Sequence, residues 1–358
     1  MATAELMTIP KRIRLGTYPY TYARVSAMKS KLLRKDDYTK LLKMKVNEIA
    51  KFLQETEYKK EIDEMAVSFS GIDLIEASLN KNLVRAFQKL KRISEGDLKL
   101  LIDAYLHRKD IMNLKTVFRG KFTKADDAYI GSLLLPVGLL RQEYFLALLK
   151  KESVEEIAKA IRFIDLSQSV KAFKENGNLF EIENQLDRYY YDALLAFTQR
   201  IPGQGTLFKA FLENEIDILN IKTILRLKRE DMPAKEIGRY VFFSGARLRR
   251  EALLKLIHLP DVNAVVAALR RYGYAKLLEE GEERLKREKT LIDIEIHLNH
   301  YLLDRAALLL HQNPLSIDVI LGYMFAKEVE IRNLKTLIKG KQLGLDEDFI
   351  SRELILHR

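Results

Sequence analysis

Apolar positions recur along this chain at the three- and four-residue spacing of one helical face. Three long segments show the pattern clearly, and their apolar positions begin at Leu74, Ile182 and Leu291. Asn313-Pro314 is expected to end the third segment, because proline lacks an amide donor and clashes with the preceding turn. Sustained alternation at a period of two, which would indicate strands, does not occur in the sequence. The chain is therefore predicted to be all-α.

A four-residue peptide returns three times within such helical patterns. It reads NLKT at 113–116, NIKT at 220–223 and NLKT at 333–336. A second landmark, Ile-Glu followed by Leu and Asn or Asp, places its glutamate 37, 37 and 38 residues before the asparagine. A third landmark, Leu-Leu-Lys, begins at residues 41, 148 and 253. Three landmarks in one order and at nearly fixed spacing predict an internal triplication.

The landmarks define the expected domains. We predict helical repeat domains at 1–121, 122–230 and 231–345, followed by a C-terminal tail at 346–358. The period is longer than the roughly 20 to 50 residues of solenoid repeats, so each copy should be a small domain rather than one turn of a solenoid. Gly120 and Gly340 follow two of the repeated peptides and are expected to cap their helices in the left-handed conformation.

The repeated polar residues are predicted to be structural. Asparagine is a poor helix former because its side chain competes for nearby backbone groups, so its threefold return suggests that it satisfies polar groups on a neighbouring helix. Carboxylates three residues earlier, at 110, 217 and 330, could pair with basic neighbours. The residues assigned this structural role are Asn113, Lys115, Asn220, Lys222, Asn333, Lys335, Glu76, Glu183 and Glu295.

Motifs that carry catalysis are missing from the sequence. It contains no phosphate-binding Gly-rich loop with Lys and a hydroxyl residue, no dinucleotide fingerprint and no G-x-S-x-G elbow. The chain has no cysteine, so a thiolate metal ligand and a cysteine nucleophile are both excluded. His297 and His300 have a spacing that could hold a metal, but only Glu295 or Asp304 could supply a nearby third ligand. We predict no catalytic residue, no cofactor and no metal site.

Charge and hydropathy limit the classes of partner. The chain has 61 basic and 50 acidic residues, a net charge of +11, which fits a polyanion, an acidic membrane face or an acidic protein. The charges are interspersed rather than gathered in a basic stripe, so nucleic acid is not expected as a partner. The longest uncharged apolar segment, 128–140, is shorter than the roughly 20 residues that cross a bilayer. It is expected to begin a buried helix, and no integral membrane span or signal peptide is predicted.

Three N-terminal segments resemble a known family. The segments YPYTYARVSAMKSKLL (18–33), YTKLLKM (38–44) and EIAKFLQETEY (48–58) are similar to the beginning of the C subunit of archaeal A-type ATP synthases, which is related to the d subunit of the vacuolar proton pump. The triplicated N-[LI]-K-T helices are also similar to that family, and the resemblance extends over nearly the whole chain. The second copy departs from the pattern with Ile221 and with no glycine after its helix.

The resemblance implies a specific architecture and role. Three similar helical domains would form a pseudo-threefold funnel. The chain would be a non-catalytic central-stalk subunit, peripheral on the cytoplasmic face of the membrane, that couples a rotor shaft of the D and F subunits to the membrane proteolipid ring. A soluble helical scaffold or adaptor outside a rotary motor is the alternative. An enzyme with a divergent site or an RNA binder forms a third class.

Overall fold

The computed structural model describes residues 16–200, 206–288, 290–311 and 315–356. In these ranges the regular secondary structure is helical and no strand occurs, which confirms the all-α prediction. The chain divides into two compact units. The first unit contains residues 1–24 and 53–204, and the second contains 25–52 and 205–358. The division into three sequence repeats therefore stays a prediction.

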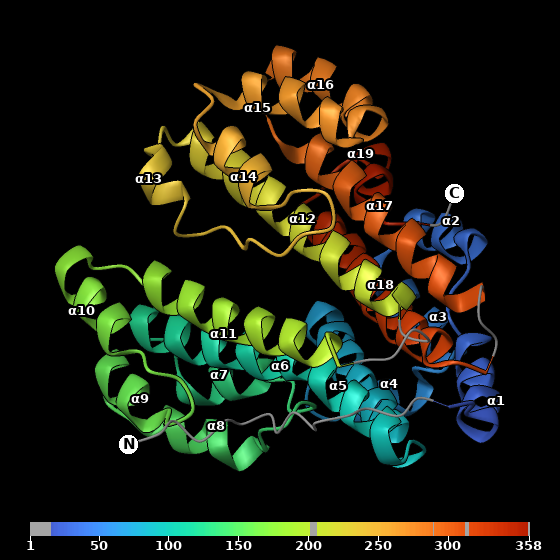
Figure 1. The fold of residues 1–358 in the computed structure, drawn as a ribbon. Helices are drawn as coiled ribbons and strands as arrows, with labels where there is room; N and C mark the ends of the chain where they lie inside the picture. Colours follow the sequence, from blue (N-terminus) through green and yellow to red (C-terminus); the bar gives the residue numbers. More distant parts are fainter. Residues whose placement is uncertain (1–15, 201–205, 289, 312–314, 357–358) are drawn as a thin grey trace. The chain divides into compact units, whose positions relative to one another are not determined.

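The first unit is built around one long helix. Its helices are α4 (Lys59–Met65), α5 (Gly71–Arg92), α6 (Gly96–Thr123), α7 (Asp127–Leu133), α8 (Gln142–Leu149), α9 (Val154–Ala160), α10 (Ser167–Asn176) and α11 (Phe180–Thr198). Helix α11 runs along α6, and α7, α8 and α9 also pack against α6 (Figure 1). The apolar face of α6 is thereby buried by elements that come after it in the chain.

The second unit contains two further long helices that carry a copy of the repeated peptide, at 220–223 and 333–336. Its C-terminal part consists of α12 (Thr206–Arg229), α13 (Ala234–Ile237), α14 (Arg250–Ile257), α15 (Val262–Leu269), the 3-10 turn Arg270–Tyr272, α16 (Ala275–Glu288), α17 (Ile292–His311), α18 (Ile317–Gln342) and α19 (Glu347–Glu353). Helix α17 packs against α12, α16 and α18. The N-terminal helix α2 (Lys35–Lys43) belongs to this unit and lies beside α19 (Figure 1). Helices α1 (Pro19–Lys29) and α3 (Val46–Gln54) contain two of the three points at which the chain passes between units.

The predicted helical segments correspond to observed helices. Leu74 lies in α5 and Ile182 in α11, while Leu291 is one residue before α17. The three repeated peptides lie in α6, α12 and α18. The expected end at Asn313-Pro314 falls outside the described residues.

The expected role of Gly120 and Gly340 as helix caps is wrong. Helix α6 continues past Gly120 to Thr123, and α18 continues past Gly340 to Gln342. A Cβ atom on Gly120 would lie 2.3 Å from Cδ1 of Ile130 in α7, and one on Gly340 would lie 2.6 Å from Cγ1 of Ile350 in α19. These glycines are needed because a short helix crosses the long helix at close range.

The three long helices nevertheless end in the same way. Left-handed backbone occurs at equivalent positions a few residues later, at Lys124 (φ 55°), Asp231 (φ 53°) and Gly344 (φ 66°). The amides of the next residues donate back to carbonyls five residues earlier: Ala125 to Gly120, Met232 to Leu227 and Leu345 to Gly340, at 2.9, 3.0 and 2.9 Å. This is the hydrogen-bond pattern of a Schellman C-cap.

The apolar segment 128–140 combines a short helix with an irregular, buried stretch. Helix α7 ends at Leu133. Two residues later, the helical conformation of Leu135 is disfavoured because Pro136 follows it. Leu134, Val137 and Leu140 then remain buried without helical structure. In the part of the chain that is described, no helix is long and apolar enough to cross a bilayer.

Candidate functional site

Each repeated asparagine binds both backbone groups of a single residue 22 positions later. The pairs are Asn113 with Leu135, Asn220 with Phe242 and Asn333 with Ile355. In each pair Nδ2 donates to the carbonyl at 2.7–2.9 Å, and Oδ1 accepts from the amide at 2.8 Å. All three side chains are buried, with at most 3% exposed. Only a carboxamide supplies a donor and an acceptor side by side, which explains why asparagine recurs here.

The partner of each asparagine is an irregular segment and not the neighbouring helix that the sequence led us to expect. Each partner lies shortly after a short helix: α7, α13 or α19. Backbone groups in such a segment have no helical partner, so burying them without hydrogen bonds would be costly. The asparagine therefore holds the buried end of a connection against the long helix.

The carboxylate three residues before each asparagine binds backbone amides as well. Asp110 accepts from Leu139 at 2.6 Å and from Leu140 at 3.2 Å. Asp217 accepts from Arg247 at 2.7 Å and from Leu248 at 3.1 Å. Both aspartates are fully buried. The basic partner expected from the sequence is thus replaced, in these two copies, mainly by backbone donors.

Glycines make room for these two carboxylates. A Cβ atom on Gly138 would approach the Asp110 oxygens to 2.3 Å, and one on Gly245 would collide with Oδ1 of Asp217. Tyr274 donates its hydroxyl to Asp217 at 3.0 Å, while His107 Nδ1 lies 2.9 Å from Asp110. Burial raises the pKa of Asp217, and the amide and hydroxyl donors partly offset that effect.

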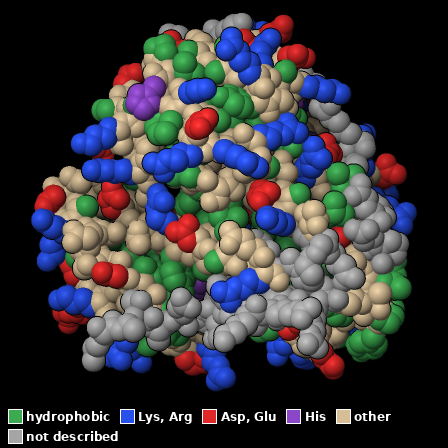
Figure 2. All heavy atoms as spheres, viewed as in Figure 1, with side chains coloured by type: hydrophobic (Ala, Val, Ile, Leu, Met, Phe, Trp, Pro, Cys, Tyr) green, Lys and Arg blue, Asp and Glu red, His purple; other side chains and the backbone are tan. Residues whose placement is uncertain are grey.

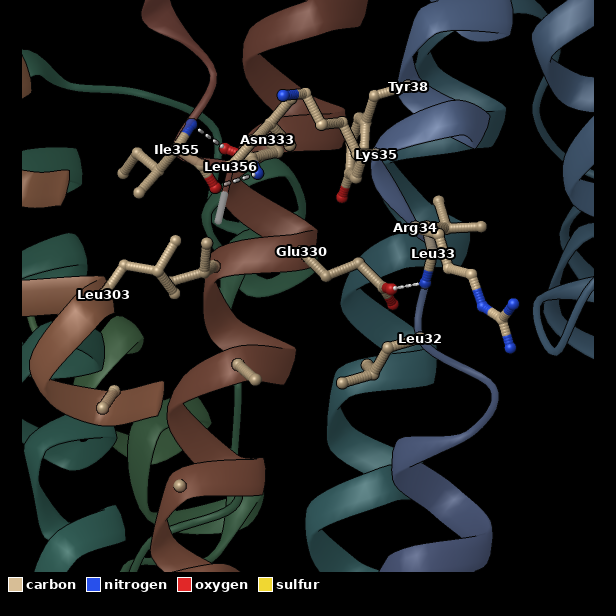
Figure 3. Close-up of a pocket in the computed structure, with 14 residues that line it drawn as sticks. Leu32, Leu33, Arg34, Lys35, Tyr38, Leu303, Glu330, Asn333, Ile355 and Leu356 are labelled. Atoms are coloured by element: carbon tan, nitrogen blue, oxygen red, sulfur yellow. Dashed lines mark hydrogen bonds between the residues drawn. The ribbon is translucent and has the colours of Figure 1, made fainter. Parts of the chain in front are cut away.

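The third carboxylate has a different supply of donors. Glu330 accepts the amide of Leu33, from the N-terminal part of the chain, at 2.5 Å. Buried Lys327 donates to its other oxygen at 2.8 Å. Figure 3 shows Glu330 directed at Leu33 and Asn333 directed at Ile355. Asp110, Asp217 and Glu330 thus share one position on their helices and one kind of backbone partner.

A second polar contact connects a long helix to an antiparallel helix that packs along it, α6 to α11 and α12 to α17. The repeated lysines donate at 2.5 Å, Lys115 to Asp187 and Lys222 to Asn299. The landmark glutamates accept from arginines that the sequence analysis missed: Glu183 from Arg119 and Glu295 from Arg226. Both arginine contacts are bidentate, with distances of 2.5–2.6 Å. The sequence does contain a signal for these arginines. Each lies six residues after its repeated asparagine, and the third copy has the basic residue Lys339 at that position.

The two remaining residues of the predicted set lie in different units. Glu76 lies in α5 of the first unit and Lys335 in α18 of the second, and both are partly buried. Their positions along the helices match those of Glu183 and Lys115. The other seven of the nine predicted residues take part in the two networks, each with a partner in its own unit.

The two lysines differ in electrostatic environment. Burial lowers the pKa of Lys222 to about 8, and the nearby Arg332 charge acts in the same direction. Its partner Asn299 is neutral, whereas Lys115 faces the carboxylate of Asp187. Burial raises the pKa of Asp187, and Lys115 partly counteracts this.

The contacts described above are hydrogen bonds and ion pairs that join helices and irregular segments within each unit. His297 Nδ1 lies 2.7 Å from the carbonyl of Asp293 in its own helix. Among the residues with described positions, no group of three or more His, Cys, Asp or Glu side chains could hold a metal ion. Lys and Arg side chains on the visible face are interspersed with Asp and Glu (Figure 2), which agrees with the charge pattern of the sequence.

Comparison with known proteins identifies the family. Residues 21–353 match the ATP synthase (C/AC39) subunit family. The chain is 36% identical over 343 residues to the A-type ATP synthase C subunit of Methanococcoides burtonii, which covers 95% of each chain. It is 36% identical over 350 residues to the C subunit of Methanosarcina acetivorans, covering 97% of this chain and 95% of that one. For the C subunit of Archaeoglobus fulgidus the identity is 34% over 342 residues, covering 95% and 97%. With both a match over nearly its full length and several relatives above 30% identity, the chain belongs to the ATP synthase (C/AC39) subunit family.

Proposed function

We propose that this chain is a non-catalytic central-stalk subunit of an A-type ATP synthase. It acts as a socket that couples a shaft of the D and F subunits to the membrane proteolipid ring, and it lies peripherally on the cytoplasmic face of the membrane. The observation that carries the proposal is the full-length similarity to proteins named as the C subunit of A-type ATP synthases. ATP and proton chemistry then belong to other subunits.

The polar networks suit a part that transmits torque. A coupling element must resist shear, and close-packed helices transmit strain because protein interiors compress little. Buried Asn and Asp side chains hold irregular segments against their long helices, and Arg–Glu pairs join α6 to α11 and α12 to α17. Each of these contacts has a defined geometry, so together they oppose sliding of one helix along another.

The proposed architecture is a triplicated helical domain arranged as a pseudo-threefold funnel. Equivalent Asn hydrogen bonds at 113, 220 and 333, and equivalent C-caps at 124, 231 and 344, support the triplication. A socket formed by three domains can bury more of a shaft than one domain can, and stable interfaces bury about 1,600 Å² in total.

The decisive experiment mixes the purified chain with a D–F shaft subcomplex. We expect a stable complex in a pull-down and no phosphate release from ATP by the chain alone. Association with the proteolipid ring in mild detergent tests the other side of the socket. Intrinsic ATP turnover would refute the non-catalytic role, and binding to neither shaft nor ring would favour an adaptor outside a rotary motor.

A further inference from the structure

The third long helix takes its amide donor from the N-terminal part of the chain, whereas the first two take theirs from downstream segments. Asp110 and Asp217 bind amides that lie 29 to 31 residues later, at 139–140 and 247–248. Glu330 instead binds the amide of Leu33, which lies 297 residues earlier. The equivalent segment for α18 therefore comes from the other end of the sequence.

The three amide-donating segments share a sequence signature. Each reads Leu-Arg immediately before a helix: Leu33-Arg34 before α2, Leu140-Arg141 before α8 and Leu248-Arg249 before α14. The arginine is extended in all three and forms the last residue before the helix. The leucine amide is the group that the carboxylate accepts from. The Leu-Leu-Lys landmark lies within each of these helices or at its end.

Further contacts hold α2 in place against the C-terminal helices. Lys341 of α18 donates to the carbonyl of Leu42 at 2.5 Å, near the end of α2. Helix α19 packs beside α2. Tyr38 and Leu41 of α2 are buried, and a hydrogen bond from Asn333 partly opposes the rise that burial causes in the pKa of Tyr38. Contacts at both ends and in the middle of α2 thus hold this helix against α18 and α19.

We propose that residues 33–43 complete the third repeat in space, so that this repeat is assembled from both ends of the chain. The inference rests on the triplication proposed above. In each repeat the carboxylate of the long helix that also carries the asparagine accepts the amide of a Leu-Arg segment that directly precedes another helix. The repeat in space therefore has different boundaries along the chain from the repeat in sequence. As a result, the N-terminal segment binds α18 and α19 as an intramolecular ligand.

The docked segment forms one wall of a pocket of about 220 Å³. Leu33 from the segment, the preceding Leu32 and Leu303 from α17 form part of its largely apolar lining (Figure 3).

Hydrogen exchange on the full chain tests the assignment with matched variants. Glu330→Gln keeps the shape of the side chain but leaves one uncharged acceptor oxygen for two donors, the Leu33 amide and Lys327. It should speed amide exchange in residues 33–43 about tenfold or more, as expected when a hydrogen bond to a charged group is weakened or lost. Asp110→Asn should speed exchange in 139–149, and Asp217→Asn in 247–257, and neither should affect 33–43.

The outcomes separate this proposal from the triplication. Suppose that the two aspartate variants speed exchange in their own segments but Glu330→Gln leaves 33–43 unchanged. The proposal that residues 33–43 complete the third repeat is then overturned, while the proposed triplication is not. If no variant loosens its segment, the shared network fails as well, and binding of the D–F shaft remains a separate measurement.

Glu330→Gln leaves buried Lys327 without its carboxylate and could unfold the unit. A second variant, Lys341→Met, avoids this risk. Lys341→Met removes the contact with Leu42 and should speed exchange at the end of α2 severalfold. Lys228→Met, at the equivalent position of α12, is the control and should leave residues 33–43 unchanged. Equal effects of the two lysine variants on 33–43 would contradict the docking site.

Discussion

At the scale of single residues, the repeated asparagine is valuable because its carboxamide matches one peptide unit in both donor and acceptor. An aspartate at the same place would present a second acceptor to a carbonyl, and a leucine would leave both backbone groups without partners. This explains how a residue that is unfavourable inside helices can recur in three of them. The local cost to the helix is small compared with the cost of an unsatisfied buried backbone group.

Asn220→Asp should destabilise the second unit by about 1–3 kcal/mol, because the Phe242 carbonyl loses its donor while buried. Urea denaturation followed by circular dichroism measures the change. Asn263→Asp, on the exposed surface of α15, is the control and should change stability by less than about 0.5 kcal/mol. Equal losses for the two variants would show that the hydrogen bonds of Asn220 contribute nothing specific.

The lysine pairs lead to a prediction about pH. The pKa of Lys222 is lowered from 10.5 to about 8, so the unfolded chain binds more protons than the folded chain between these values. The stability contribution of this group therefore rises as pH increases from about 8 to 10.5. Asn299→Asp recreates the Lys115–Asp187 pair, and should raise the pKa of Lys222 and stabilise the unit by about 1 kcal/mol at pH 7.

Denaturation midpoints at pH 7 and pH 10 would test this, with Asp187→Asn as the reciprocal variant in the first unit. Asn299→Asp should reduce the gain in stability between the two pH values, and Asp187→Asn should lower stability at pH 7. An Asn299→Asp chain that is less stable than the wild type at pH 7 would contradict the electrostatic account.

At the scale of elements, the long helices α6, α12 and α18 end with one cap but with different residues in the left-handed position. Gly344 adopts positive φ without strain, whereas Lys124 and Asp231 carry a Cβ atom that disfavours it. The hydrogen bonds are the same in all three, so the cap is selected by the short helix that comes next. After α6 and α18 that helix must turn back sharply to cross the long helix beside Gly120 or Gly340.

Asp231→Gly and Lys124→Gly should each stabilise the protein by about 1 kcal/mol, because glycine removes the steric cost of the left-handed conformation. Thermal unfolding would show the gain as a higher midpoint. Lys228→Gly, three residues earlier and inside α12, should instead lower stability by about 1 kcal/mol. A loss at position 231 comparable to that at 228 would exclude the proposed cap effect.

At the scale of the whole molecule, the second unit joins residues from both ends of the chain. Contacts between positions 297 and 299 residues apart, Leu33 with Glu330 and Leu42 with Lys341, are part of this unit. Such contacts form only when a large loop has closed, which costs entropy and makes them late rather than early events in folding.

The absence of tryptophan from the chain allows a direct test of this connection. A tryptophan replacing partly buried Leu42 in α2 should follow the same urea transition as one replacing Phe325 in α18. A tryptophan at Tyr189 in α11 reports on the first unit for comparison. Separate transitions at 42 and 325 would show that the N-terminal helix does not unfold with the second unit.

The sequence by itself determined the elements of this protein. The 3.6-residue apolar pattern locates α5, α11 and α17 because it depends on neighbours within two turns, and the spaced landmarks identify residues that share a role. Family membership was also evident from the N-terminal segments. Such features depend on local order along the chain, which a single sequence displays.

Only the tertiary structure decided which groups the polar residues bind. The partner of Asn113 lies in an irregular segment, Gly120 accommodates Ile130 rather than capping a helix, and Arg119 reaches Glu183. Periodicity carries no information about these pairings, because they depend on how separate elements pack. For the same reason, no spacing along the chain predicts the hydrogen bond between Leu33 and Glu330. The two residues meet only when both ends of the chain fold into one unit.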